Sequence, residues 1–224
     1  MKPADIVCTA VLPKDFDDGL NFVLQAFPAT PAGEPVQSLL NRLHSLLAGK
    51  YAELAVERFL RSHGIAHQTF AAKIDANSSR FFFRVKNENV ELKYIVLPNR
   101  RASAAKIIEA FALVPAEHWR QRARLARYIF TVYTGDLRLI LKQNPSRYLT
   151  AQKIPRREDV ELKGSSASVF LAAAPSRAEC EQKFRHLPVR TPCLQYPEGL
   201  PEQCFGCRMA ELTAFKTAIQ WGGV

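Results

Sequence analysis

The sequence predicts an α/β domain, and three observations lead to that expectation. Residues 37–63 show the three- and four-residue spacing of an amphipathic helix. Residues 80–86 and 90–97 are two runs rich in Phe, Val, Ile and Tyr, separated by a short polar link, as in a β-hairpin. Helical spacing resumes at residues 102–113. We therefore expect a sheet flanked by helices.

The chain divides into three segments. Residues 1–36 are expected to be an irregular lead-in, because Pro28, Pro31 and Pro35 oppose helix formation. Residues 37–175 form the expected α/β core, and residues 176–224 form a Cys-rich C-terminal segment.

The helix over residues 37–63 has Gly49 as a possible break and His63-Gly64 as its expected end, since glycine takes the left-handed conformation that ends helices. The other elements are assigned by the same periodicities. The expected strands cover 67–74, 80–86, 90–97, 128–133, 137–142 and 169–173, with 128–133 pairing to 137–142; the expected helices cover 102–113, 116–126 and 209–220.

The chain is basic, with 31 Lys and Arg against 21 Asp and Glu and a net charge of +10. A basic surface releases counterions when it meets a phosphate backbone, so DNA is the expected partner, with RNA as an alternative. The basic residues expected to contact the backbone are Arg100, Arg101, Arg120, Arg124, Arg127, Lys153, Arg156 and Arg157. The alternative for the arginines at 120–127 is a solvated helix face.

No secretory signal begins the sequence, and no segment approaches the roughly 20 apolar residues of a membrane span. We expect an intracellular, cytoplasmic protein without a membrane partner, whose five cysteines stay reduced.

Four of those cysteines, Cys180, Cys193, Cys204 and Cys207, follow the spacing C-x12-C-x10-C-x2-C. Four thiolates suit a zinc ion or an iron–sulfur cluster, and reduced structural thiols are the alternative. A redox or metal-regulatory role centred on these cysteines is a third, weaker interpretation of the protein.

Glu91 and Lys93 are two residues apart on an expected strand, so both side chains should leave the same sheet face. Glu53 lies on the helix before the sheet. Carboxylates that hold Mg²⁺ beside a lysine suit phosphodiester hydrolysis, because the metal polarises the phosphate and the lysine assists the attacking water. The alternative is a surface ion pair, and Glu161-Leu162-Lys163 repeats the triplet elsewhere.

Two parts of the sequence resemble the PD-(D/E)XK nuclease superfamily: the run from Gly49 to Ile65, which contains Glu53, and the later Val90-Glu91-Leu92-Lys93. Within the superfamily, the resemblance is to the branch of Holliday-junction resolvases and Mrr-like restriction enzymes. The resemblance implies a restriction-endonuclease-like mixed sheet, and a DNA endonuclease with Mg²⁺ or Mn²⁺. It also implies a homodimer or a place in a larger nuclease assembly.

The family has a metal-binding Asp on its second strand, where this chain has Ser78, Ser79, Arg80 and Phe81. The nearest upstream acid is Asp75. The resemblance thus implies Glu53, Asp75 and Glu91 as metal ligands and Lys93 as the residue that assists water. If Asp75 does not serve, the alternative is a non-catalytic nucleic-acid-binding subunit on a degenerate nuclease fold.

Overall fold

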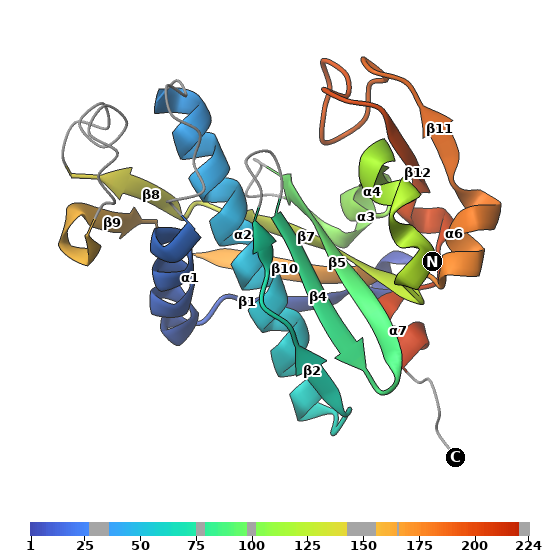
Figure 1. Ribbon diagram of the computed structural model, residues 1–224, viewed down its shortest axis with the longest axis horizontal. Coiled ribbons are helices and arrows are strands. Elements are labelled where there is room, and N and C mark those ends of the chain that lie inside the picture. Colours follow the sequence, from blue (N-terminus) through green and yellow to red (C-terminus); the bar gives the residue numbers. More distant parts are fainter. Residues whose placement is uncertain (27–35, 75–78, 98–101, 143–155, 165, 220–224) are drawn as a thin grey trace.

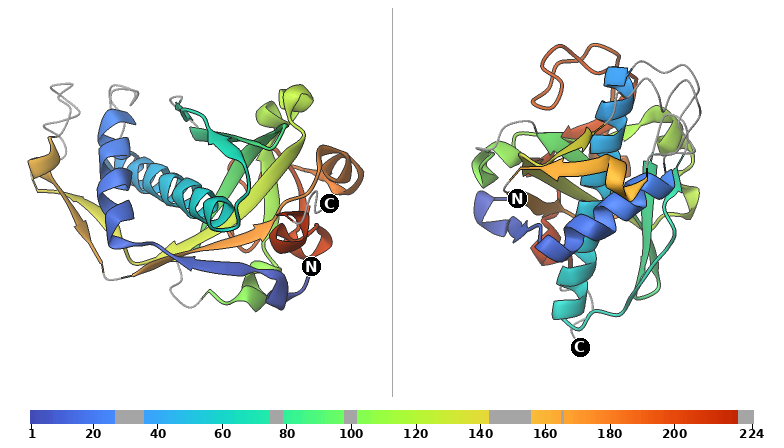
Figure 2. Two further views of the ribbon diagram at one scale, coloured as in Figure 1. Left: turned by 90° about the horizontal axis from the view of Figure 1, so that it is seen from below. Right: turned by 90° about the vertical axis from the view of Figure 1, so that its left-hand side faces the viewer.

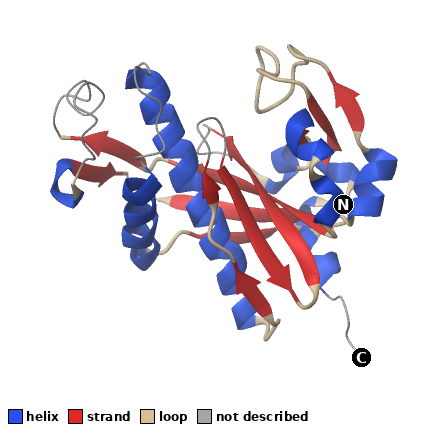
Figure 3. Ribbon diagram, viewed as in Figure 1, coloured by secondary structure: helices blue, strands red, loops and turns tan. Residues whose placement is uncertain are grey.

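A curled mixed sheet is the centre of the computed structural model, which describes residues 1–26, 36–74, 79–97, 102–142, 156–164 and 166–219 (Figures 1 and 3). Its strands are β1 (Val7–Ala10), β2 (His67–Thr69), β3 (Lys73–Ile74), β4 (Ser79–Val85), β5 (Glu88–Leu97), β7 (Arg127–Gly135) and β10 (Ala167–Ala173). The order is β1-β10-β7-β5-β4-β2, and β3 also pairs with β4. Strands β5 and β7 run parallel and the other pairs are antiparallel, so the expected mixed α/β core is present.

Smaller elements surround the main sheet. A second sheet contains β11 (Arg185–Leu187), β12 (Cys204–Arg208) and β6 (Phe111–Pro115), and a third pairs β8 (Arg138–Leu141) with β9 (Val160–Lys163). The α-helices are α1 (Pro13–Ala26), α2 (Val36–Ser62), α3 (Ala104–Ile107), α4 (Ala116–Arg120), α6 (Arg177–Lys183) and α7 (Phe215–Ile219). Short 3₁₀ turns are η1 (Pro3–Asp5), η3 (Arg122–Arg124), η4 (Arg157–Asp159) and η5 (Met209–Glu211).

Helix α2 runs without interruption through Gly49, so the possible break at this glycine is wrong. A Cβ atom at Gly49 would lie 2.5 Å from the ring of Phe81 and 2.7 Å from the ring of Tyr94. The glycine therefore serves close packing of α2 on β4 and β5 and not a turn. The predicted helix end is confirmed, because Gly64 has a φ of 65° just after the last turn.

The main sheet is covered on both faces, and each face has its own apolar core. The sheet curls around α2, as Figure 2 shows in the view from below, and α1 packs beside α2. Leu92 of β5 belongs to this first core. The opposite face lies under β6, β12 and α6, and its core contains Tyr128, Phe130 and Cys180. Side chains that alternate along β5 therefore enter two different environments.

Other expectations about the elements are also wrong. The lead-in is not irregular throughout, because β1 pairs with β10 and α1 packs on α2; the proline-rich residues 27–35 lie outside the described residues. Residues 111–115 form a strand of the second sheet and not the end of a helix, because their main chain pairs with β12. The segment at residues 137–142 gives β8, whose partner is β9 and not β7.

None of the helices within the described ranges is long and apolar enough to cross a membrane.

Candidate functional site: a buried charge network beside a basic cleft

Glu91 and Lys93 lie together on the face of β5 that is turned away from α2. The Glu91 side chain is fully buried, and its Oε1 lies 2.8 Å from Nζ of Lys93. Arg80, from the neighbouring strand β4, donates from Nε to Oε1 at 2.8 Å and from Nη2 to Oε2 at 3.1 Å. Nζ of Lys93 also lies within hydrogen-bond distance of Nδ1 of His118, at 3.0 Å. The pair that the sequence predicted on one face is thus the centre of a four-residue network.

The charges of the network offset one another. Burial works to raise the pKa of the Glu91 carboxyl, but the ammonium of Lys93 and the guanidinium of Arg80 outweigh it and hold the pKa below its ordinary value. Burial lowers the pKa of Lys93, and the attraction of Glu91 opposes that shift only in part. Glu91 is therefore an ionised, doubly paired carboxylate.

Glu53 lies on the other side of the sheet. It is a buried residue of α2, and its carboxylate accepts a hydrogen bond from Lys50 on the same helix. Helix α2 faces the strand positions of Leu92 and Tyr94, whereas Glu91 alternates with them. Burial raises the pKa of the Glu53 carboxyl, and Lys50 only partly counters this. The structure thus does not bring Glu53 and Glu91 together.

Asp75, the remaining carboxylate of the expected metal site, lies outside the described residues. Among the residues that are described, no group of three or more His, Cys, Asp or Glu side chains is placed to hold a metal ion. Both oxygens of Glu91 already accept hydrogen bonds from cations, and Glu53 faces the other core. The described residues therefore do not fit Mg²⁺ or Mn²⁺, which need convergent, available carboxylate oxygens.

The four tail cysteines do not form one cluster in the described part of the chain. Cys204 and Cys207 lie three residues apart on the extended strand β12, so their side chains leave opposite faces and make no knuckle. Cys180 and Cys207 belong to the second apolar core, whereas Cys204 lines a cleft described below. Burial raises the pKa of the Cys204 thiol to about 11 and that of Cys207 to about 12, and it raises that of Cys180. All five cysteines are free thiols, and Cys193 is half-buried.

The arginines expected on a nucleic-acid surface have different environments. Arg120, Arg124 and Arg156 are exposed. Arg127 instead holds the fold together, because it donates to Glu88 at 3.1 Å and to the carbonyl of Ala174 at 2.8 Å. Arg157 is paired with Asp17 at 2.9 Å. The remaining basic residues of the expected surface, Arg100, Arg101 and Lys153, lie outside the described residues.

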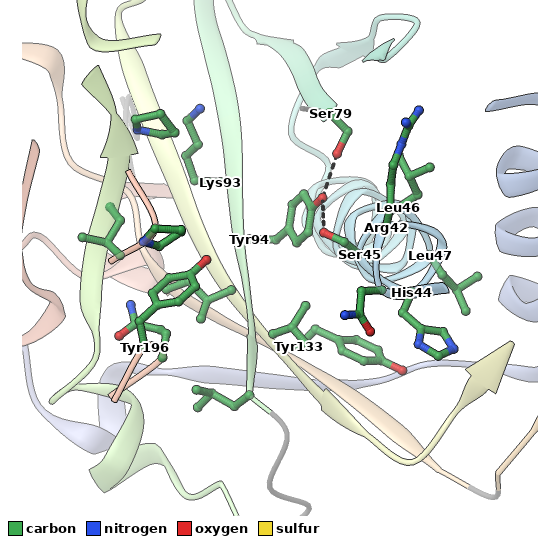
Figure 4. Close-up of a pocket in the computed structure, with 18 of the residues that line it drawn as sticks. Arg42, His44, Ser45, Leu46, Leu47, Ser79, Lys93, Tyr94, Tyr133 and Tyr196 are labelled. Atoms are coloured by element: carbon green, nitrogen blue, oxygen red, sulfur yellow. Dashed lines mark hydrogen bonds between the residues drawn. The ribbon is translucent and has the colours of Figure 1, made fainter. Parts of the chain in front are cut away.

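A cleft of about 980 Å³ opens along the C-terminal half of β5 (Figure 4). On one side it is bounded by α2 and the start of β8, and on the other by β6, α4 and the segment 195–204. Its described lining includes the cations of Arg42, Lys93 and Arg138, and its only acid is Glu202. Lys93 and His118 are thus the two members of the buried network that reach the cleft.

Sequence reasoning named Arg138 among the basic residues placed for backbone contact, but it did not single out Arg42 or Tyr196, and it gave His118 a structural or surface role. These residues come from α2, β8, a loop before β12 and α4, which are far apart along the chain. No local spacing could have indicated that they line one cleft.

We compared the chain with models of known protein families, with curated proteins and with solved structures, and no match was found in any of the three.

Proposed function

We propose that the protein binds nucleic acid in the cleft along β5. The observation that carries the proposal is the charge of the described lining, in which Arg42 and Arg138 stand against one acid, Glu202, beside Lys93, whose ammonium is paired with Glu91. Arginines position a phosphate backbone through charge-assisted hydrogen bonds, and a cleft lined by one sign of charge concentrates ligands of the other. The net charge of +10 favours the approach of a polyanion.

Within this proposal, the Glu91 network is a structural support. Arg80 and Lys93 neutralise the buried carboxylate, and Glu91 in turn fixes the Lys93 ammonium at the wall of the cleft. A buried carboxylate that holds a lysine in place orders a phosphate ligand in advance. The non-catalytic subunit is accordingly the better-supported form of the nucleic-acid hypothesis.

A metal-dependent DNA endonuclease is the second candidate. One observation favours it: Glu91 and Lys93 emerge from the same face of β5, and Lys93 reaches the cleft. The described residues offer Mg²⁺ no convergent set of carboxylates, so we derive no step through the metal.

Two measurements on the full-length protein test these candidates. Fluorescence anisotropy with labelled DNA and RNA should show binding that Arg138→Ala weakens and that rising salt abolishes. Arg84→Ala is the matched control, because Arg84 is an exposed arginine on β4 that does not line the cleft. Absence of binding at low salt would contradict the proposal.

Incubation with plasmid DNA in Mg²⁺ or Mn²⁺ separates the two candidates. The binding proposal predicts intact plasmid for both the wild type and Lys93→Ala. Cleavage by the wild type that Lys93→Ala abolishes would establish the nuclease instead.

A further inference from the structure

The cleft extends around the edge of strand β5 and so reaches both faces of the sheet. Six consecutive residues of β5, from Leu92 to Leu97, line it, although successive side chains of a strand point to opposite faces. Figure 4 shows Lys93 and Tyr196 on one side of β5, and Arg42 and Tyr94 on the other side, toward α2. The cleft therefore has two lobes that meet at the edge of the strand.

The two lobes differ in chemistry. The first, which we call the arginine lobe, contains Arg138 of β8 beside His44 of α2, and it is bordered by Arg42, which leaves α2 in a different direction from His44 (Figure 4). The second, which we call the tyrosine lobe, contains Lys93 and Tyr196 with apolar walls; these walls are formed by Ile95, Leu97, Leu113 and Pro115. The arginine lobe suits phosphate groups, and the tyrosine lobe suits a flat ring with polar edges, such as a nucleic-acid base.

Tyr196 is exposed, and hydrogen bonds fix the path of the loop that carries it. Its side chain is 43% exposed, which is unusual for a large aromatic residue. Its main chain exchanges two hydrogen bonds with Cys193, at 3.0 and 3.1 Å, and accepts a third from Gly199 at 2.9 Å. The neighbouring Gln195 bonds through its side-chain amide to both main-chain groups of Phe111 in β6.

The turn at Gly199 closes the same loop. Gly199 has a φ of 106°, and a Cβ atom there would lie 2.5 Å from the main chain of Arg190. Only glycine fits this approach, so the loop has one close-packed path. A tyrosine held in this way stacks on a ligand with little loss of conformational entropy.

The size of the cleft suits a short segment of nucleic acid. Its volume of about 980 Å³ is at the top of the roughly 300–1,000 Å³ range of small-ligand pockets, enough for a few nucleotides. Duplex DNA keeps its bases stacked inside the helix, whereas a single strand presents phosphates and bare base faces together.

From these observations we infer that the cleft binds single-stranded nucleic acid, with one base stacked on Tyr196 and the adjoining phosphates in the arginine lobe. This inference rests on the proposed function and adds the form of the ligand and the residue that contacts its base. The backbone crosses the edge of β5, and Lys93 faces the stacked nucleotide from the wall of the tyrosine lobe.

The test is an anisotropy titration of the full-length protein with a labelled oligothymidine and with a duplex of the same length. We expect the single strand to bind at least tenfold more tightly than the duplex. Tyr196→Ala should weaken single-strand binding by about tenfold, within the range measured for loss of one base–aromatic stack. Tyr196→Phe keeps the ring and should bind like the wild type.

Leu194→Ala is the matched control, because Leu194 lies on the same loop with the same 43% exposure and is not part of the cleft lining. It should leave the affinity unchanged, and circular dichroism should show that all variants are folded. Equal or tighter binding of the duplex, or an unchanged affinity for Tyr196→Ala, would overturn the inference while leaving the proposed function intact.

A polyglutamate peptide that displaces the oligonucleotide at equal charge concentration would also overturn the inference, in favour of an acidic protein partner. If no nucleic acid binds at all, the proposed function fails together with the inference.

Discussion

The guanidinium of Arg80 holds both oxygens of the Glu91 carboxylate, with Nε 2.8 Å from Oε1 and Nη2 3.1 Å from Oε2. Glu91 is fully buried, and this two-point contact is a main reason that its charge is tolerated there. These two hydrogen bonds also occupy the carboxylate oxygens of Glu91 that a metal ion would need.

The first prediction concerns the stability of this contact. Arg80→Ala leaves the buried Glu91 with Lys93 as its remaining cation, and we expect a loss of about 3 kcal/mol in the free energy of unfolding. Urea denaturation followed by circular dichroism measures it. Arg84 is an exposed arginine on the same strand and the same face as Arg80. Its replacement in Arg84→Ala should cost less than about 1 kcal/mol. Equal losses for the two variants would mean that the contact with Glu91 contributes nothing specific.

The second prediction concerns pH. Burial lowers the pKa of His44, whose Nε2 accepts a hydrogen bond from the amide of Leu139 at 2.8 Å. As the pH falls, His44 takes up a proton near pH 6.5 in the unfolded chain and only at a lower pH in the folded protein. The stability due to His44 is therefore present above pH 6.5 and is lost as the pH falls below it. We expect His44→Ala to cost about 1–2 kcal/mol at pH 7.5 and less at pH 5.5.

The unfolding free energies of the wild type, His44→Ala and His63→Ala at the two pH values check this prediction. His63 is exposed near the end of α2, and its replacement should have a small effect at both pH values. A His44→Ala difference that grows on acidification would contradict the sign.

The third prediction separates structural thiols from a metal site. Cys180 and Cys207 are buried in the second apolar core and their thiol pKa values are raised, so they should react with a thiol reagent only after unfolding. Cys8, which is exposed, should react first. Mass spectrometry of labelled peptides and elemental analysis of the purified protein measure this. Stoichiometric zinc or iron, with chelation needed before the tail cysteines react, would restore the four-thiolate interpretation.

The sequence predicted the parts of this structure that depend on local periodicity. The hairpin of β4 and β5 follows from its aromatic and β-branched residues, and Glu91 and Lys93 share a face because strand side chains alternate. Residues 111–113 were expected as the end of a helix, because apolar spacing does not distinguish a short buried strand from a helix. Pairing with β12 decides the outcome.

The site was less predictable because it depends on contacts between distant segments. The periodicity of α2 gave no indication that Glu53 and Glu91 would lie on opposite sides of the sheet. The cleft likewise joins Arg42, Arg138 and Tyr196, which come from distant parts of the sequence and have no motif in common. The DNA or RNA partner, the homodimer or larger nuclease assembly, and the cytoplasmic location stay predictions.

The most direct test of the account is the salt dependence of nucleic-acid binding by the cleft. The dissociation constant for a labelled single-stranded oligonucleotide is measured over a range of salt concentrations for the wild type, Arg42→Ala/Arg138→Ala and Arg84→Ala. Each phosphate contact in a single strand contributes about 0.7 to the slope of log affinity against log salt, so the double variant should lower the magnitude of that slope by about 1.4. It should also bind more weakly at low salt, while Arg84→Ala follows the wild type. A double variant with the affinity and slope of the wild type would contradict the claim that this cleft is the nucleic-acid site.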